Sequence, residues 1–254
     1  MLSKTQRRQI LQLSQKKHRL ASGLFVAEGE KVVRELLDSN WTYHSLYSTD
    51  SKLHPEAEHI SEGEMKQLTH FKTPSPVLGV FEMPQARALV NESVSLVLDG
   101  ISDPGNLGTL IRLCDWFGLS ELICSKSTVD CFNPKVVQAT MGSIARVHCH
   151  YVSDLGTVLR DLNKPIFGAS ASGTSIYTTT LPPKGTYVLG SESHGISKAV
   201  SAHLDATLAI PHFKSNQQRA ESLNVATAGA IFLSELFRSN GLFKSDNKCY
   251  SSRK

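Results

Sequence analysis

The sequence predicts an α/β protein whose larger part is built on a mostly parallel sheet. From Ser95 onward, short and uninterrupted apolar runs alternate with segments of helical periodicity. Strands that are apolar throughout are typical of parallel sheets covered by helices on both faces. The chain has 254 residues, 40% of them hydrophobic and 20% charged. At this length, folding removes roughly 70–75% of the unfolded chain's surface from water, which is enough for a large core.

Residues 1–85 predict a smaller α/β domain. Ser3–Lys17 places Ile10, Leu11 and Leu13 at helical spacing among polar residues, which indicates a surface helix. Residues 86–94 belong to a polar segment without periodicity, and we expect a linker there. The other elements expected in this domain are strands at Phe25–Glu28, Ser45–Tyr47 and Val77–Phe81, and helices at Gly29–Asp38 and Glu62–Leu68.

Residues 95–240 predict the larger domain. Its last helix has the clearest pattern, because Val225, Ile231 and Phe232 fall on one side. Residues 241–254 form a basic tail that we expect to be disordered. The strands expected in the larger domain are Ser95–Leu98, Glu121–Cys124, Val147–Val152, Pro165–Ala169, Thr186–Leu189 and Ala206–Ile210, and the helices are Leu107–Phe117, Pro134–Ile144, Leu155–Leu162 and Ser222–Arg238.

Positive charge is concentrated at the two ends of the chain. The net charge is only +4, but residues 1–20 contain no acidic residue. Basic ends favour a polyanionic partner, because each neutralised phosphate releases condensed counterions. A solvated helix face followed by a disordered tail is the alternative interpretation of the same charges. The cations concerned are Lys4, Arg7, Arg8, Lys16, Lys17 and Arg19 at one end, and Lys244, Lys248, Arg253 and Lys254 at the other.

Several classes of protein are excluded by the residues that the chain lacks. Its five cysteines are an odd number without a CxxC pair, which argues against a disulfide framework and a structural zinc site. His148 and His150 on a strand lack further ligands, so we expect no metal. The apolar run at residues 23–27 is too short for a signal peptide or a membrane span. We therefore expect a cytoplasmic protein with no membrane partner.

Three loops that follow expected strands carry unusual polar residues and glycines. In open α/β sheets, ligands bind beyond the carboxyl ends of the strands. The loop at residues 99–112 combines Gly105 and Gly108 with Asn106 and Arg112 near the start of a helix. It matches neither a GxGxxG pattern nor a Walker loop, which disfavours a cofactor bound through phosphate. The alternative is a tight turn with Asn106 as the helix cap.

The second and third loops lie later in the same domain. After the strand ending at Leu189, Gly190 and Gly195 flank Glu192; the alternative is an acidic start to a helix. A serine-hydrolase elbow requires G-x-S-x-G, and this pattern fails by one residue because Ser191 stands two positions before Ser193. In the third loop, Ser222 is suited to cap the last helix, whereas the Asn224 amide requires a hydrogen-bond partner. Each loop alone is a weak signal, but the three together are a strong one.

In order and character, these loops resemble the motifs of the SpoU (TrmH-type) RNA ribose 2′-O-methyltransferases of the SPOUT superfamily. The resemblance spans about Ser95–Arg238. Upstream, Leu24–Leu37 is similar to the start of that family's small substrate-binding domain, which resembles certain ribosomal proteins. The residues that carry the main resemblance are Asn106, Gly108 and Arg112; Gly190, Glu192 and Gly195; and Ile210, Pro211, Ser222, Leu223 and Asn224.

The resemblance implies a deep trefoil knot in the C-terminal part of the sheet, a homodimer, and S-adenosylmethionine as the cofactor. It implies that Arg112 engages the target 2′-hydroxyl while Asn106, Glu192, Ser222 and Asn224 order the pocket. Arginine stays protonated, so we expect Arg112 to stabilise a developing alkoxide, whereas the family proposal makes it a base. The residues implied for cofactor binding are Leu189, Gly190, Gly195, Ile210, Pro211 and Leu223.

One departure from the family concerns the third loop. The segment between Pro211 and Ser222 is longer than the family's compact version, lacks glycine, and adds Lys214 and Arg219. The family's backbone path near the methionine part of the cofactor therefore does not carry over to this segment, although Ser222, Leu223 and Asn224 still match. The added positive charge can contact RNA.

The expected function is methylation of RNA at the ribose 2′-oxygen, with ribosomal RNA as the substrate and transfer RNA as the alternative. A noncatalytic RNA-binding or assembly factor with the same fold is a second hypothesis, which methyl incorporation into RNA would exclude. A serine hydrolase using Ser191 or Ser193 is a third, which binding of S-adenosylmethionine would disfavour.

Overall fold

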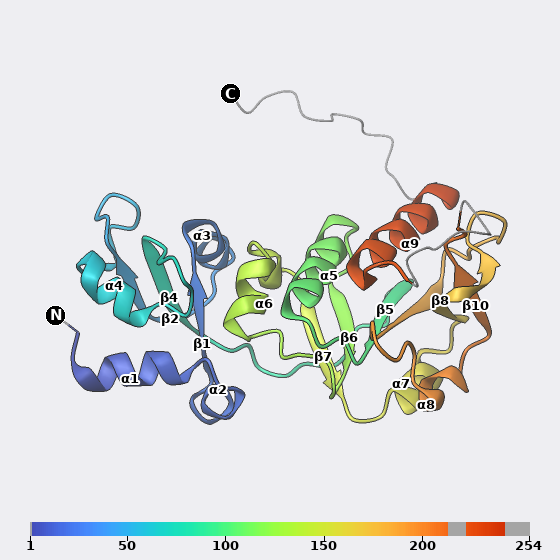
Figure 1. Ribbon diagram of the computed structural model, residues 1–254, viewed down its shortest axis with the longest axis horizontal. Helices are drawn as coiled ribbons and strands as arrows, with labels where there is room; N and C mark the ends of the chain where they lie inside the picture. The colour runs from blue at the N-terminus through green and yellow to red at the C-terminus, as the bar shows by residue number, and fades with distance from the viewer. Residues whose placement is uncertain (1, 213–221, 242–254) are drawn as a thin grey trace, which may run out of the picture.

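The computed structural model describes residues 2–212 and 222–241, which form two lobes side by side, each with its own sheet (Figure 1). Lys214, Arg219 and the basic tail from residue 242 lie outside the described residues. The four cysteines in the described part of the chain are free thiols. Among the described residues, no helix combines the length and hydropathy needed to cross a bilayer.

The N-terminal lobe is a four-stranded mixed sheet in the order β1-β4-β2-β3. β4 pairs antiparallel with both β1 and β2, whereas β2 and β3 are parallel. The expected strands of this lobe and its expected helices after residue 23 are present, and the short β3 is an addition. The elements are α1 (Lys4–Gln12), α2 (Lys16–Ser22), β1 (Leu24–Glu28), α3 (Glu30–Asp38), β2 (Tyr43–Ser48), β3 (Glu58–His59), α4 (Glu62–Leu68) and β4 (Val77–Glu82).

The single helix expected at Ser3–Lys17 is wrong, because the chain breaks between α1 and α2. Leu13 caps the end of α1 and is buried. The Arg19 guanidinium donates to the carbonyl oxygens of Leu13 and Ser14 at 2.7 and 2.9 Å, which fixes the turn. Arg19 was also counted among the cations available to a polyanion, and this too is wrong: it is 1% exposed and pairs with Asp130 at 2.5 Å.

The second lobe contains a six-stranded sheet in the order β10-β8-β9-β5-β6-β7, with every neighbouring pair parallel. This confirms the mostly parallel α/β fold. The elements are β5 (Val94–Asp99), α5 (Pro104–Trp116), β6 (Glu121–Ser125), α6 (Pro134–Ala139), a 3₁₀ turn (Ser143–Ala145), β7 (His148–Val152), α7 (Leu155–Leu162), β8 (Ile166–Ser175), β9 (Gly185–Gly190), α8 (Lys198–Ser201), β10 (Ala206–Ala209) and α9 (Val225–Ser239).

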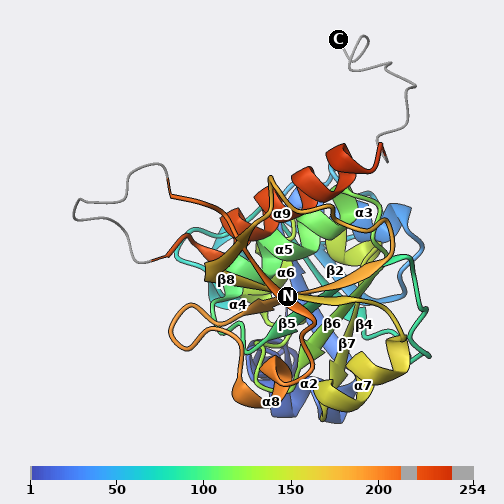
Figure 2. The same ribbon diagram turned by 90° about the vertical axis from the view of Figure 1, so that its right-hand side faces the viewer.

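Helices cover both faces of this sheet. Figure 2 shows α5, α6 and α9 on one side and α7 and α8 on the other. The side chains of β5 alternate accordingly, because successive residues of a strand point to opposite faces. Leu96 and Leu98 share a core with Leu110 of α5, whereas Val97 packs with Leu159 of α7. The continuous apolar run of β5 therefore supplies two cores at once.

Several boundaries in the second lobe differ from expectation; α5, for example, begins at Pro104 and not at Leu107. α6 ends at Ala139 instead of continuing to Ile144, because Met141 and Gly142 both take positive φ. β8 continues to Ser175, beyond the expected end at Ala169. α9 begins at Val225 with Asn224 as its N-cap, so the expected cap at Ser222 is wrong.

The buried Arg19–Asp130 pair connects α2 to the loop after β6 and gives the first prediction. Arg19→Ala leaves Asp130 and two carbonyl groups without their donor. We expect the free energy of unfolding to fall by about 3–5 kcal/mol, measured by urea denaturation. Lys17→Ala removes an exposed cation from the same helix and should change stability by less than about 0.5 kcal/mol. Equal effects of the two substitutions would contradict a structural role for the pair.

Candidate active site

The end of β9 leads into a tight turn. Ser191 and Gly195 exchange two backbone hydrogen bonds, of 3.0 and 2.8 Å, and Gly195 takes φ of +65°. The interpretation of Glu192 as the start of a helix is therefore wrong, because the next helix is α8, capped by Ser197. Glu192 instead lies at the exposed tip of the turn.

Gly190 lies directly beneath the returning backbone of this turn. A Cβ atom at position 190 would stand 2.2 Å from the carbonyl carbon of Gly195 and 2.3 Å from the nitrogen of Ile196. No real Cβ contact is so short, and the neighbouring atoms are backbone, which cannot rotate away. Only glycine fits at this crossing of the chain.

A line of hydrogen bonds joins the three predicted loops. Asn224 donates from Nδ2 to Oδ1 of Asn106 at 2.8 Å, and Asn106 donates from its own Nδ2 to the carboxylate of Glu192. Oδ1 of Asn224 meanwhile accepts from two backbone N–H groups at the start of α9, at 3.0 and 3.2 Å. The expectation that Asn224 requires a partner is confirmed.

Capping of α5 leaves Asn106 free for this network. The N-cap is Asp103, whose Oδ1 accepts from the backbone nitrogen of Asn106 at 2.8 Å. The alternative in which Asn106 caps its own helix is therefore wrong. The amide side chain points instead to segments that lie 86 and 118 residues further along the chain.

A cavity of about 450 Å³ adjoins this network. Every residue expected to bind the cofactor lines this cavity, except Pro211. Among the residues expected to order the pocket, Glu192 and Ser222 line the cavity. Sequence reasoning missed Ala169, Ser170 and Ala171, because β8 was expected to end at Ala169. The small residues Ser170 and Ala171, directly after the expected strand, are the sequence feature that could have indicated this part of the cavity wall. The other lining residues are Ser191, His194, Ile196, Ser201, Leu204, Thr207, His212, Val225, Ala228 and Phe232.

Arg112 is apart from both the network and the cavity. It follows Asn106 by six residues on α5, so the two side chains leave the helix about 9 Å apart along the axis and about 120° apart around it. Arg112 is exposed and forms no hydrogen bond or ion pair with any described residue. One turn later, Trp116 is 72% exposed. The two residues share an uncovered face of α5.

A larger cavity, of about 530 Å³, lies between the lobes and contains none of the predicted site residues. His148 and His150 line it, and burial lowers the pKa of His148. His150 contacts the Glu121 carboxylate, which also pairs with Arg87. Within the described ranges, no group of three histidine, cysteine or acidic residues could hold a metal ion.

The structure contains only part of the catalytic triad that a serine hydrolase requires. Oγ of Ser193 lies 2.8 Å from Nδ1 of His194, but the two are neighbours in the chain. In the described part of the molecule, no carboxylate is hydrogen-bonded to His194, so the third member of a catalytic triad is missing.

The chain is similar to known RNA methyltransferases along most of its length. The chain is 30% identical to the 23S rRNA (guanosine(2553)-2′-O)-methyltransferase RlmP of Bacillus subtilis (strain 168), over 88% of this chain and 92% of RlmP. A solved structure of a putative RNA methyltransferase of the TrmH family from Porphyromonas gingivalis is 37% identical, with a TM-score of 0.83 over 94% of this chain and 99% of that one. An AdoMet-bound rRNA methyltransferase from Sinorhizobium meliloti is 28% identical, with a TM-score of 0.81 over 94% and 97%.

Two family models match consecutive parts of the chain. Residues 4–79 match the MRM3-like substrate binding domain. Residues 93–234 match the SpoU rRNA Methylase family, which is more than half of the sequence. The chain therefore belongs to the SpoU rRNA Methylase family.

Proposed function

We propose that this chain transfers a methyl group from S-adenosylmethionine to a ribose 2′-hydroxyl of ribosomal RNA. The hydrogen-bonded line Asn224–Asn106–Glu192 beside the 450 Å³ cavity carries the proposal. The name of RlmP specifies 2′-O-methylation of 23S rRNA, and the Sinorhizobium enzyme is an rRNA methyltransferase with the cofactor bound. These relatives favour ribosomal RNA over transfer RNA.

The residues around the cavity suit S-adenosylmethionine. An adenine ring and a thioether need apolar walls, and Leu189, Ile210 and Phe232 supply them. Gly190 leaves the floor free of a side chain. Glu192 and Ser222 add polar groups on one side. We assign cofactor binding to the predicted set, with Pro211 acting by holding its neighbour Ile210.

When bound, this cofactor supplies an electrophilic methyl group on a sulfonium sulfur, which a ribose oxygen can accept in line with the breaking C–S bond. Arg112 is assigned to the ribose. Its guanidinium stays protonated, so it stabilises negative charge that develops on the oxygen, and the hydroxyl proton passes to solvent water. Asn106, Glu192, Ser222 and Asn224 hold the polar side of the pocket in one arrangement.

We further propose a homodimer, because Arg112 and Trp116 share an uncovered face of α5. A second copy on this face would cover the indole ring and bring an arginine to a site whose described lining contains none. We also propose the deep trefoil knot of the SPOUT fold, supported by the backbone crossing at Gly190.

We assign RNA binding and methyl transfer to separate lobes, each with its own sheet. Residues 1–85 bind RNA, residues 86–94 are the linker, and residues 95–240 carry the reaction. The separate matches at residues 4–79 and 93–234 support this division. We propose the cytoplasm as the compartment, since the substrate is ribosomal RNA.

The proposal predicts that the wild-type chain transfers labelled methyl groups to ribosomal RNA from a strain lacking this protein, at linkages that resist alkali. Arg112→Ala should lower the rate by about 10²–10³, the cost of losing one donor to a developing oxyanion. Arg160→Ala, on the opposite side of the sheet, is the matched control and should retain the rate. No transfer by the wild type would refute the function. Near-normal turnover by Arg112→Lys would refute a role for the guanidinium fork.

A second prediction concerns Gly190. Gly190→Ala forces a methyl group into the backbone of Gly195 and Ile196, so the turn must shift and the cavity floor must change. We expect calorimetry to show affinity for S-adenosylmethionine reduced by about 5- to 150-fold, which corresponds to an overpacking cost of about 1–3 kcal/mol. Gly63→Ala in α4 serves as the control, because a Cβ there would meet only Oγ of Ser61 at 3.9 Å, an ordinary contact. Unchanged affinity in Gly190→Ala would place the cofactor elsewhere.

A further inference from the structure

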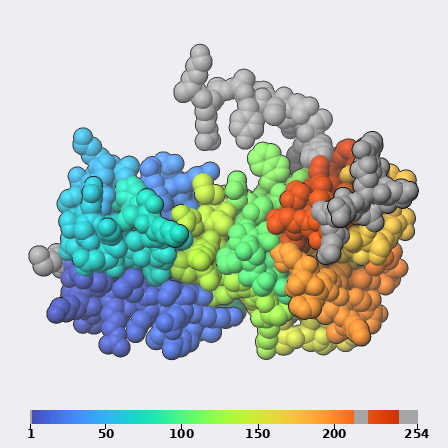
Figure 3. Space-filling view, in the orientation of Figure 1, coloured from blue at the N-terminus to red at the C-terminus, as the bar shows by residue number. Residues whose placement is uncertain are grey.

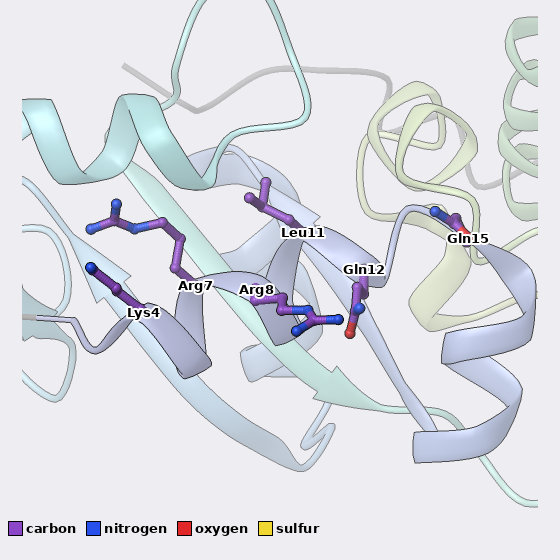
Figure 4. Close-up of a pocket in the computed structure, with 6 residues that line it drawn as sticks. All are labelled: Lys4, Arg7, Arg8, Leu11, Gln12 and Gln15. Atoms are coloured by element: carbon purple, nitrogen blue, oxygen red, sulfur yellow. The ribbon is translucent and has the colours of Figure 1, made fainter.

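A groove of about 370 Å³ runs along α1, on the outside of the N-terminal lobe and separate from the active-site cavity. We call it the α1 groove. It is lined by Lys4, Arg7, Arg8, Leu11 and Gln12 of α1 and by Gln15, which precedes α2 (Figure 4). Three of the six lining residues are cations, two are amides, and none is acidic.

The cations of the α1 groove have no anionic partner among the described residues. Lys4 and Arg8 are exposed, and none of the three cations forms an ion pair with a described residue. Arg7 carries a stronger signal, because its Nε is buried and has no hydrogen-bond acceptor. A buried donor without an acceptor is unfavourable, and an anion bound by the Arg7 guanidinium would offset this cost. The first turn of α1 has no acidic residue either, and the helix dipole adds positive potential there.

The groove leads toward the catalytic lobe. Gln15, at one end, immediately precedes α2, and α2 is attached to the second lobe by the Arg19–Asp130 pair. At the same boundary, the Lys16 ammonium lies 5.4 Å from the centre of the Tyr151 ring. Figure 3 shows α1 and α2 as one continuous surface along the side of the molecule. A chain of phosphates lying in the groove would therefore be directed from the N-terminal lobe to the junction with the second.

We propose that the α1 groove binds the sugar–phosphate backbone of the ribosomal RNA substrate, an inference that rests on the proposed function. Lys4, Arg7 and Arg8 contact phosphates, and the amides of Gln12 and Gln15 donate to phosphate or sugar oxygens. Leu11, which is 38% exposed, contacts a ribose. Contacts of this kind fix the position of the RNA but do not read its bases.

The test measures binding to unmodified, in vitro transcribed 23S rRNA over a series of salt concentrations. The variant Lys4→Gln/Arg7→Gln/Arg8→Gln should reduce the slope of log affinity against log salt by about 2–3, because each phosphate contact contributes about 0.7–0.9. The Michaelis constant for RNA should rise, whereas kcat at saturating RNA and the Michaelis constant for S-adenosylmethionine should not change. The matched control, Lys31→Gln/Lys52→Gln/Lys72→Gln, removes the same charge from exposed sites of the same lobe and should leave the slope nearly unchanged.

A second variant separates binding from folding. Lys4→Gln/Arg8→Gln changes only exposed side chains, so α1 should remain folded by circular dichroism while the slope falls by about 1–2. An unchanged slope, or an equal change in the control, would overturn the proposal. Normal binding to naked RNA with loss of binding to ribosomal particles would overturn it in favour of a protein partner. If the slope falls as expected but the wild type transfers no methyl group, the groove stands and the proposed function fails.

Discussion

The close passage of Gly190 beneath Gly195 and Ile196 is the constraint on which the cavity and its polar network depend. Since no side chain can stand between these backbone segments, the chain leaving β9 folds back within five residues. The same turn forms one wall of the cavity and carries Glu192 to the tip, where it contacts Asn106. A larger residue at position 190 would therefore change the cavity and the polar network together.

The polar network has a fixed direction, and the helix cap sets it. Asn224 uses its oxygen to accept from the first N–H groups of α9, so its nitrogen must face Asn106. The Asn106 oxygen is then an acceptor, and its nitrogen must donate to Glu192. One capping bond therefore orients two amides and holds a carboxylate from a third segment. Asn224, which is assigned to the pocket, therefore also stabilises the start of α9.

Sequence reasoning located most elements because their patterns are local. The strands β1, β5 and β9 are short apolar runs, so the local order of apolar residues is enough to locate them. It failed where a distant residue decides the outcome. The break between α1 and α2 depends on Arg19, which bonds two carbonyl groups and Asp130, and no periodicity reveals this. The three loops were predicted to converge, but the separation of Arg112 from Asn106 follows only from helix geometry and burial.

Hydrogen exchange with and without S-adenosylmethionine tests most directly whether the cavity formed by these three loops binds the cofactor. The account predicts slower exchange on addition of the cofactor in residues 189–196, 207–210 and 222–229, where the lining of the cavity is concentrated. Residues 4–82, in the other lobe, should exchange at unchanged rates. Slower exchange confined to residues 144–152, around the cavity between the lobes, would contradict the account.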